Sequence, residues 1–266
     1  PHAEEPVPEA PDDPDRLARV NLQLYKSWYG GVIRYWKGAW YVWKTQTRHY
    51  EHYSPKRMEA KVWSAVKEEF DRLWNVEMKR YEDGEGNSDE PPPVCRKVKD
   101  TLVRNVMSAM RSRCYISEDI ELHQWIENQG DRSDNMISMA NGLLDIDAVL
   151  ANRDLEDCLF PHSPDWFSTT YLPYNFDPRA EWPEWDKFLE TSMEGDYERI
   201  NVLQEWAGYL LVADTSAQKM MILIGDGANG KSVFCGAMEA MLGPDNCSHI
   251  QFESIAEKFQ QVATLG

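Results

Sequence analysis

Long apolar runs are missing from this 266-residue sequence, and none approaches the roughly 18 residues that a membrane-spanning helix needs. The chain opens on Pro1, without the basic stretch and apolar run of a secretory signal. Its five cysteines form no CxxC pair, a spacing typical of reduced thiols rather than of a disulfide framework. We therefore expect no membrane partner and a reducing compartment, and we expect that the natural N-terminus lies upstream of Pro1.

Basic residues are scarce, with 28 Lys and Arg against 45 Asp and Glu and a formal charge of -17. Such a balance disfavours nucleic acid as a partner, because phosphates are neutralised by Lys and Arg. The basic residues are nevertheless segregated, since residues 21–113 hold 18 of them against 12 acidic residues. A solvated surface of mixed charge and a DNA-binding face explain this segregation about equally well.

Apolar side chains are almost absent from residues 1–15, a Pro-rich and acidic stretch that predicts a disordered linker. An aromatic and β-branched pattern around Lys37 and Gly38 then predicts a β-hairpin. Aromatic side chains next to basic ones can stack on single-stranded bases, but cross-strand packing in a core is the favoured interpretation here. The aromatic residues concerned are Tyr35, Trp36, Trp40 and Trp43.

A long helix is predicted to begin at Ser54 and Pro55, which have the order of an N-cap and a first helical residue. Apolar side chains then recur at helical spacing and define a face that we expect to be core. The members of this face are Trp63, Val66, Phe70 and Leu73.

Helical spacing also predicts helices over residues 98–110 and 120–126, whereas the Gly-rich, Pro-rich and acidic residues 81–93 predict an exposed loop. His49 and His52 lie three residues apart, but no Cys, His or carboxylate cluster completes a metal site around them.

Two short strands about an Asn141-Gly142 turn are predicted between residues 136 and 150, and an extended connection over residues 160–183. Later helices are predicted at residues 185–193, at residues 200–211 with Asp196 as N-cap, and from Ser254.

The strongest chemical signal is a Gly-rich loop from Gly225 to Ser232, which fits the pattern GxxxxGK[ST] without a mismatch. The apolar residues 220–224 before it predict a buried strand, and a helix to about Met241 is predicted after it. This order of strand, loop and helix is the setting that a phosphate-binding loop requires. The sequence therefore predicts a nucleoside triphosphate site for ATP with Mg²⁺.

Each residue type in the loop has a chemical reason. Glycines at 225, 227 and 230 permit positive φ and let backbone N–H groups approach phosphate oxygens. Lys231 is expected to contact the β and γ phosphates and Ser232 to ligate Mg²⁺, so both are predicted catalytic residues. Asn229 either places its amide near the γ phosphate or favours the turn. The predicted nucleotide-binding residues are Gly225, Asp226, Gly227, Ala228, Asn229, Gly230, Lys231 and Ser232.

Hydrolysis also needs an acidic residue at the end of a second strand. Asp245, Glu253 and Glu257 follow Ser232, but none of them follows an apolar strand. We therefore expect the sequence to end before the second acidic motif, so that independent hydrolysis is in doubt.

The loop and its surroundings resemble the C-terminal helicase part of phage and plasmid primases, which is related to the poxvirus primase-helicase within the superfamily 3 helicases. The form Gly-Ala-Asn-Gly-Lys-Ser at 227–232 is the most specific match. Segments similar to the helicase part are 203–211, 221–232 and 259–266, and those similar to its helicase-associated N-terminal domain are 141–145 and 160–178.

This resemblance implies an ATP-driven DNA helicase of phage, plasmid or virus replication, in the cytoplasm of a host cell. It implies single-stranded DNA at a replication fork as partner, a homo-oligomeric ring such as a hexamer, and a fused or associated primase. The sequence departs from the family in lacking the later polar sensor and arginine finger, and it shows no primase carboxylate set.

The expected fold is α/β and α+β in successive parts. A disordered linker over residues 1–15 precedes a mostly helical, helicase-associated domain over 16–182, and residues 183–266 form the N-terminal part of a P-loop, AAA+-like ATPase domain. Two alternatives remain open, a P-loop enzyme with a small-molecule substrate such as a kinase, and a non-catalytic nucleotide-binding module. Stimulation of ATP hydrolysis by single-stranded DNA would separate the helicase from both.

Overall fold

The computed structural model describes residues 9–29, 32–84, 91–127, 133, 135–212, 216–227 and 229–250. The chain divides into two compact units, one made of residues 1–46 and 50–121 and the other of residues 47–49 and 122–266. Both combine helices with small antiparallel sheets, an α+β arrangement. Because this division falls after residue 121, it is distinct from the domain boundary predicted at 182, which stays a prediction.

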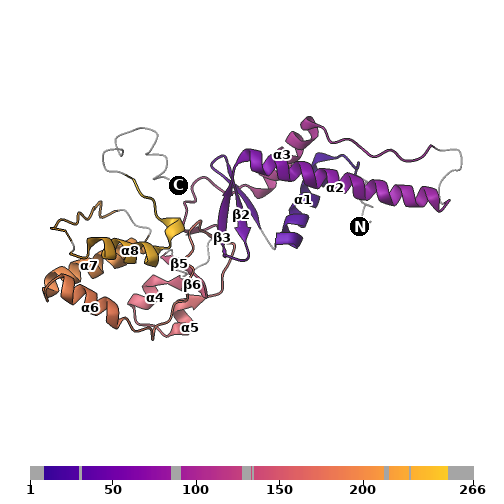
Figure 1. Ribbon diagram of the computed structural model, residues 1–266. Coiled ribbons are helices and arrows are strands. Elements are labelled where there is room, and N and C mark those ends of the chain that lie inside the picture. The colour runs from indigo at the N-terminus through magenta and orange to yellow at the C-terminus, as the bar shows by residue number, and fades with distance from the viewer. Residues whose placement is uncertain are drawn as a thin grey trace. The chain divides into compact units, whose positions relative to one another are not determined.

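The first unit packs helices against one face of a three-stranded sheet with the strand order β1-β2-β3 (Figure 1). The first helix already begins at Pro14, inside the stretch predicted as a linker. No helix in the described part of the chain is both long and apolar enough to cross a membrane. The elements are α1 (Pro14–Tyr29), β1 (Ile33–Trp36), β2 (Ala39–Lys44), β3 (His49–Tyr53), α2 (Pro55–Glu82) and α3 (Asp100–Cys114).

The predicted hairpin around Lys37 and Gly38 is confirmed. Trp36 pairs with Ala39, so that Lys37 and Gly38 form a two-residue turn, and both have left-handed φ values of 45° and 83°. Two left-handed residues match the twist of the strands that they join, and glycine adopts this conformation at little cost. The tryptophans of the hairpin are buried, which confirms the core interpretation over base stacking. Their exposed fractions are 7% for Trp36, 1% for Trp40 and 5% for Trp43.

Helix α2 begins where its capping residues predict. The Ser54 hydroxyl accepts a hydrogen bond from the Arg57 backbone N–H at 3.2 Å, and Pro55 occupies the first helical position. The helix continues to Glu82, so the first residues of the loop predicted over 81–93 are helical. Trp63 is 39% exposed and does not belong to the core face, because the buried row runs through Val62, about 100° away around the helix.

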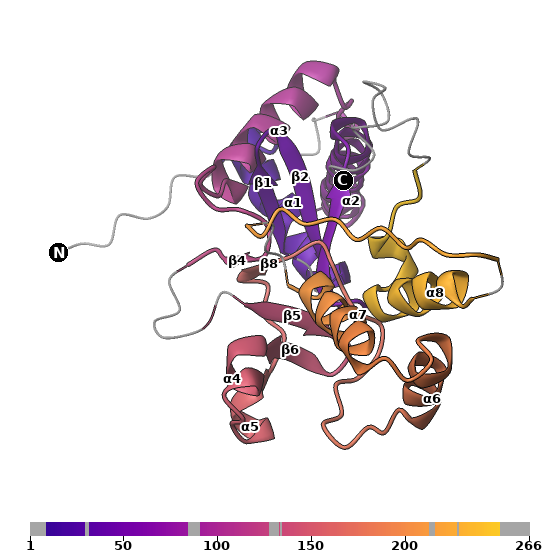
Figure 2. The ribbon, with the colours of Figure 1, turned by 90° about the vertical axis from the view of Figure 1, so that its left-hand side faces the viewer.

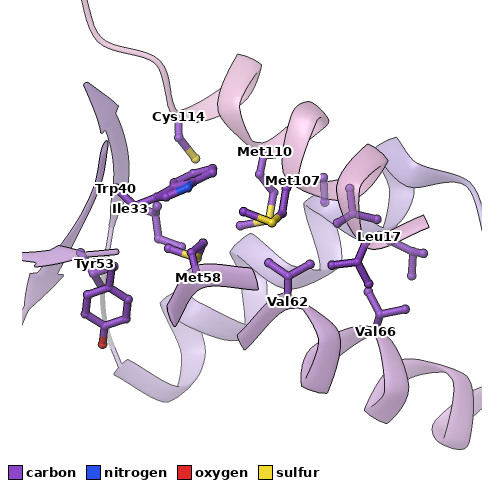
Figure 3. Packing of buried hydrophobic residues seen from close by; sticks show 14 of the residues in the cluster. Leu17, Ile33, Trp40, Tyr53, Met58, Val62, Val66, Met107, Met110 and Cys114 are labelled. Carbon is purple, nitrogen blue, oxygen red and sulfur yellow. The ribbon is translucent and has the colours of Figure 1, made fainter. Parts of the chain in front are cut away.

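The core of the first unit is rich in methionine and β-branched side chains that interlock between α1, α2, α3 and the sheet (Figure 3). Trp40 is the largest fully buried side chain in it. Burying one of the valine or methionine side chains contributes about 1.5 to 3 kcal/mol. The buried members include Leu17, Ile33, Trp40, Met58, Val62, Val66, Val106, Met107, Met110 and Cys114.

A single carboxylate, Glu69, is buried on the same face of α2 at 5% exposure. Arg72 donates two hydrogen bonds to it, from Nε at 2.7 Å and from Nη2 at 2.9 Å, and Arg16 of α1 pairs with the same carboxylate. The hydrogen bonds from Arg72, aided by Arg16, hold the pKa of Glu69 below its ordinary value against the opposing effect of burial. The buried carboxylate of Glu69 is therefore paired with arginines from both helices, and this ion-pair cluster joins α1 to α2.

The second unit contains two small antiparallel sheets followed by helices (Figure 2). One sheet pairs β4 (Gln124–Trp125) with β8 (Trp166–Phe167), and the other has the order β5-β6-β7. Residues 120–126 contain β4, so the helix predicted there is wrong. Its apolar side chains serve strand pairing instead, and the rings of Trp125 and Trp166 lie edge to face at 5.3 Å.

The predicted hairpin at Asn141 and Gly142 is confirmed, although its turn lies one residue earlier. Met139 pairs with Gly142, so the two turn residues are Ala140 and Asn141. The Asn141 side chain exchanges two hydrogen bonds with the backbone of Phe176, both at 2.9 Å. A Cβ on Gly142 would lie 2.6 Å from the carbonyl oxygen of Phe160, which explains glycine there by close approach.

The remaining elements of the second unit confirm the helices predicted at 185–193 and 200–211. Asp196 caps the second of these helices by accepting from the Arg199 N–H at 3.2 Å. The helix predicted from Ser254 lies outside the described residues. The elements are β5 (Met136–Met139), β6 (Gly142–Asp145), α4 (Ile146–Leu150), α5 (Leu155–Cys158), β7 (Leu159–Phe160), α6 (Pro183–Ser192), α7 (Tyr197–Leu210), α8 (Lys231–Leu242) and the 3-10 helix η1 (Pro244–Asn246).

We predict that Glu69→Gln lowers the free energy of unfolding by about 2 kcal/mol at pH 7, because two arginines lose a charged acceptor. The control Glu68→Gln changes an exposed neighbour and should shift it by less than about 0.5 kcal/mol. Urea unfolding measures both.

The effect of Glu69→Gln should also depend on pH. A folded-state pKa below the ordinary 4.5 means that the stabilisation is present above that value and is lost as the pH falls through the lower, folded-state pKa. A deficit that stays constant from pH 7 down to about pH 3 would contradict the role of the charge.

Candidate phosphate-binding site

The predicted phosphate loop joins an extended segment to helix α8. Gly230 lies directly before the helix with φ 85° and ψ -4°, a left-handed conformation, and its carbonyl oxygen accepts from the Phe234 N–H at 2.9 Å. The N–H groups in the first turn of a helix have no acceptor within the helix, and the positive end of the helix dipole lies there. The loop therefore ends on a group of donors suited to an anion.

Lys231 is folded back over the loop that precedes it. Its ammonium nitrogen donates to the carbonyl oxygens of Gly225 at 2.8 Å and Asp226 at 2.9 Å, and to the Asn229 side-chain oxygen at 2.6 Å. Three residues of the predicted site are thus gathered around the ammonium group of a fourth. Asn229 contacts Lys231 across the loop, and the two roles predicted for its side chain both stay predictions.

The three loop glycines differ in what they do. Only Gly230 has a positive φ, so Gly225 and Gly227 do not use the left-handed conformation that glycine permits. A Cβ on Gly225 would lie 2.1 Å from the Asn229 Nδ2, so a larger residue there would displace the Asn229 side chain. A Cβ on Gly227 would meet nothing within 4 Å, and nothing in the structure explains a glycine at that position.

Residues 220–224 do not form the predicted buried strand. They have no regular secondary structure and no described strand pairs with them, whereas a strand is held by hydrogen bonds to a neighbour. Burial of the side chains still alternates along this segment. Met221 and Leu223 pack against the helices, whereas the intervening side chains face outward. The outward-facing side chains are Met220 at 67%, Ile222 at 66% and Ile224 at 90% exposure.

Helices α6 and α7 supply the wall against which the loop rests. A Cβ on Gly230 would lie 2.9 Å from the Ser192 Oγ and 3.1 Å from the Phe188 ring. Trp185 stacks on Phe234 of α8 with ring centroids 6.0 Å apart, which fixes α6 beside α8. Sequence reasoning missed this wall, because the apolar spacing of α6 predicts a buried face without identifying its neighbour.

A cavity of about 960 Å³ lies between these elements. Its lining combines apolar side chains with the loop, and it includes both charge signs, because Glu194 and Glu198 line it together with Arg199 and Lys231. Arg199 also pairs with Asp196 at 3.0 Å. The cavity is large enough for a small organic ligand, since such sites usually occupy about 300 to 1,000 Å³.

The other predicted residues are placed as follows. Ser232 is exposed in the first turn of α8, Asp226 and Gly227 are exposed in the loop, and Ala228 lies outside the described residues. In the described part of the chain no group of three or more His, Cys, Asp and Glu side chains could hold a metal ion. That finding does not concern a serine hydroxyl, and the magnesium role of Ser232 stays a prediction.

The opposite end of α8 is tied to the loop that follows β8. Tyr174 donates its hydroxyl to the carbonyl oxygen of Met241, and burial raises the pKa of this tyrosine. The Asn246 amide donates to the carbonyl oxygens of Leu242 at 2.7 Å and Tyr171 at 3.1 Å. These contacts anchor the C-terminal end of the helix, so its N-terminal end keeps a defined direction toward the loop.

The family model described as D5 N terminal like matches residues 23–194, about two thirds of the chain. The chain therefore belongs to this family, the N-terminal domain of D5-like primase-helicase proteins. Membership supports a replication-related function and an enzyme of primase-helicase type. No curated protein matches the chain. The matched residues end before Gly225, so the phosphate loop is an independent line of argument.

We predict that Gly230→Ala destabilises the second unit by about 1 to 2 kcal/mol, because a left-handed residue acquires a Cβ. The added methyl would also press on Ser192 and Phe188. Gly227→Ala is the matched control, and it should change stability by less than about 0.5 kcal/mol. Urea unfolding followed by tryptophan fluorescence compares the two, and equal losses would contradict the assigned geometry.

Proposed function

We propose that the loop at Gly225–Ser232 binds ATP with Mg²⁺ and that the protein is an ATP-dependent DNA helicase of the primase-helicase type. The observation that carries the proposal is the convergence of the α8 N-terminus and the Lys231 ammonium group on one loop. Family membership supports the replication setting, and the loop supports the nucleotide.

The chemistry of the loop fits a triphosphate. The carbonyl and amide oxygens that Lys231 contacts are neutral acceptors, and a phosphate oxygen is a stronger one, because its negative charge also attracts the ammonium group electrostatically. Triphosphate binding would exchange these neutral partners for charged ones. The N–H groups of the first turn of α8 add donors without a charge of their own.

Ser232 is the residue that would hold magnesium. Mg²⁺ prefers oxygen ligands and keeps several waters, so one protein hydroxyl together with phosphate oxygens suits it. Bound there, the ion would neutralise charge on the phosphates during phosphoryl transfer. Because Ser232 is exposed at the start of α8, its hydroxyl is accessible for that contact.

We predict that Lys231→Ala weakens binding of a fluorescent ATP analogue at least about tenfold, because a charged hydrogen-bond donor is lost. Lys219→Ala is the control, since it removes the same charge from an exposed lysine that does not line the cavity. Equilibrium titration of the 266-residue chain with Mg²⁺ present measures both.

Equal affinity in the parent chain and in the Lys231→Ala variant would reject the nucleotide site. Loss of affinity in both variants would point to general electrostatics rather than to the loop. The unfolding midpoint of each variant is recorded alongside, so that a folding defect is not mistaken for a binding defect.

The helicase part of the proposal has its own test. In the complete gene product, single-stranded DNA should stimulate ATP hydrolysis, and Lys231→Ala should abolish both hydrolysis and strand separation of a forked duplex. Hydrolysis that is indifferent to DNA would favour an enzyme with a small-molecule substrate. ATP binding without any turnover would favour a nucleotide-binding module.

A further inference from the structure

Helix α3 and its flanks carry a concentration of positive charge within an acidic protein. Residues 95–116 contain six Lys and Arg and a single acidic residue, Asp100, whereas the whole chain carries a formal charge of -17. This local excess of positive charge is opposite in sign to the charge of the whole chain. What the basic residues can contact depends on the side of α3 on which they lie.

The packing of α3 against the core decides which of its side chains face outward. Val103, Val106 and Met110 of α3 are completely buried against the core of the first unit. Arg104, four residues before Ser108 and seven before Arg111, lies on the opposite, exposed side of the helix. We call Arg104, Ser108, Arg111 and Tyr115 the α3 surface.

The two arginines of the α3 surface have no acidic partner among the described residues. By contrast, Arg113 at the edge of the helix pairs with Asp15 of α1 at 2.6 Å. Asp15 thus pairs with Arg113, and also with Arg19 of α1. Asp100, the acidic residue of α3, lies one turn before Arg104 without forming an ion pair with it, and no acidic residue of the helix lies within a turn of Arg111. Two exposed guanidinium groups about 10 Å apart along a helix suit successive anionic groups of an extended ligand.

A polar groove of about 680 Å³ borders this surface between α1 and α3. Its lining combines the exposed residues Asn105, Ser108 and Ser112 with Ala109 and with the ion pair of Asp15 and Arg113. Amide and hydroxyl donors beside arginines are the groups that proteins use to contact the phosphates of nucleic acids. The groove therefore offers polar donors to one side of the arginines, and its carboxylate, Asp15, is already paired with Arg113.

An exposed aromatic ring ends the surface. Tyr115 is 55% exposed directly after the helix, and its backbone is held in place because the Ile116 N–H donates to the Tyr35 carbonyl oxygen at 3.1 Å. The Arg111 guanidinium lies 5.7 Å from the centroid of the Tyr35 ring. An exposed ring on a held backbone, one helical turn beyond Arg111 in the chain, is a combination that suits unstacked bases together with their phosphates.

We propose that the α3 surface binds single-stranded DNA, with Arg104 and Arg111 on phosphates and Tyr115 stacked on a base. A duplex would leave Tyr115 without a partner, because its bases are already stacked on each other. The choice of DNA rests on the proposed helicase function, but the surface lies in the first unit and uses no residue of the nucleotide loop.

The test is fluorescence anisotropy of a labelled oligo(dT) titrated with the 266-residue chain in the absence of nucleotide. Arg104→Ala/Arg111→Ala should weaken binding about tenfold and should reduce the slope of log affinity against log salt by about 1.4. Lys79→Ala/Arg80→Ala removes the same charge from two exposed residues at the end of α2, and it should leave affinity within about twofold of the parent.

Three further variants separate charge from stacking. Arg104→Lys/Arg111→Lys should restore the salt slope, because both charges return. Tyr115→Ala should weaken binding about fivefold or more, whereas Tyr115→Phe should not, because phenylalanine keeps the stacking ring.

Three results would overturn the proposal: no binding of oligo(dT) by the parent chain, equal losses in the α3 and α2 variants, or tighter binding of a duplex of the same length. Binding of the fluorescent ATP analogue is measured on the same variants and should not change. Failure of the nucleotide site would therefore appear in that titration and not in the DNA titration.

Discussion

The burial of one face of α3 against α1, α2 and the three-stranded sheet is the constraint on which the first unit depends. Met107, Met110 and Cys114 on that face interlock with Met58 of α2 and Trp40 of the sheet (Figure 3). Close packing of this kind leaves little freedom to rotate a helix about its axis, because rotation would open cavities. The arginines on the opposite side of α3 consequently face outward, so the core determines the polarity of the surface.

In the second unit, too, an exposed site depends on the elements that pack against it. The phosphate loop is exposed, but its geometry is set where Gly230 meets Phe188 and Ser192 of α6. The stacking of Trp185 on Phe234 holds α6 beside α8, and contacts at the far end of α8 hold its direction. Family membership covers residues 23–194 and the loop lies beyond them, so the two arguments for a primase-helicase are independent.

Local chemistry made several elements predictable. The turn at Lys37 and Gly38, the Ser54 cap and the Asp196 cap each depend on residues within a few positions of one another, and each was found where expected. The errors arose where a distant partner decides. Residues 120–126 have helical spacing but pair with β8, and Trp63 lies just outside the face that the core selects.

The sequence alone determined the class of chemistry, because the spacing of glycines, Lys231 and Ser232 in the loop is legible without coordinates, as are the positions of turns and caps. The tertiary structure alone decided which side of α3 faces outward, which loop glycine is left-handed, and which helix supports the loop. The reason is physical. Hydrogen bonds in turns and caps join near neighbours in the chain, whereas burial, strand pairing and close packing join residues whose separation in sequence carries no signal.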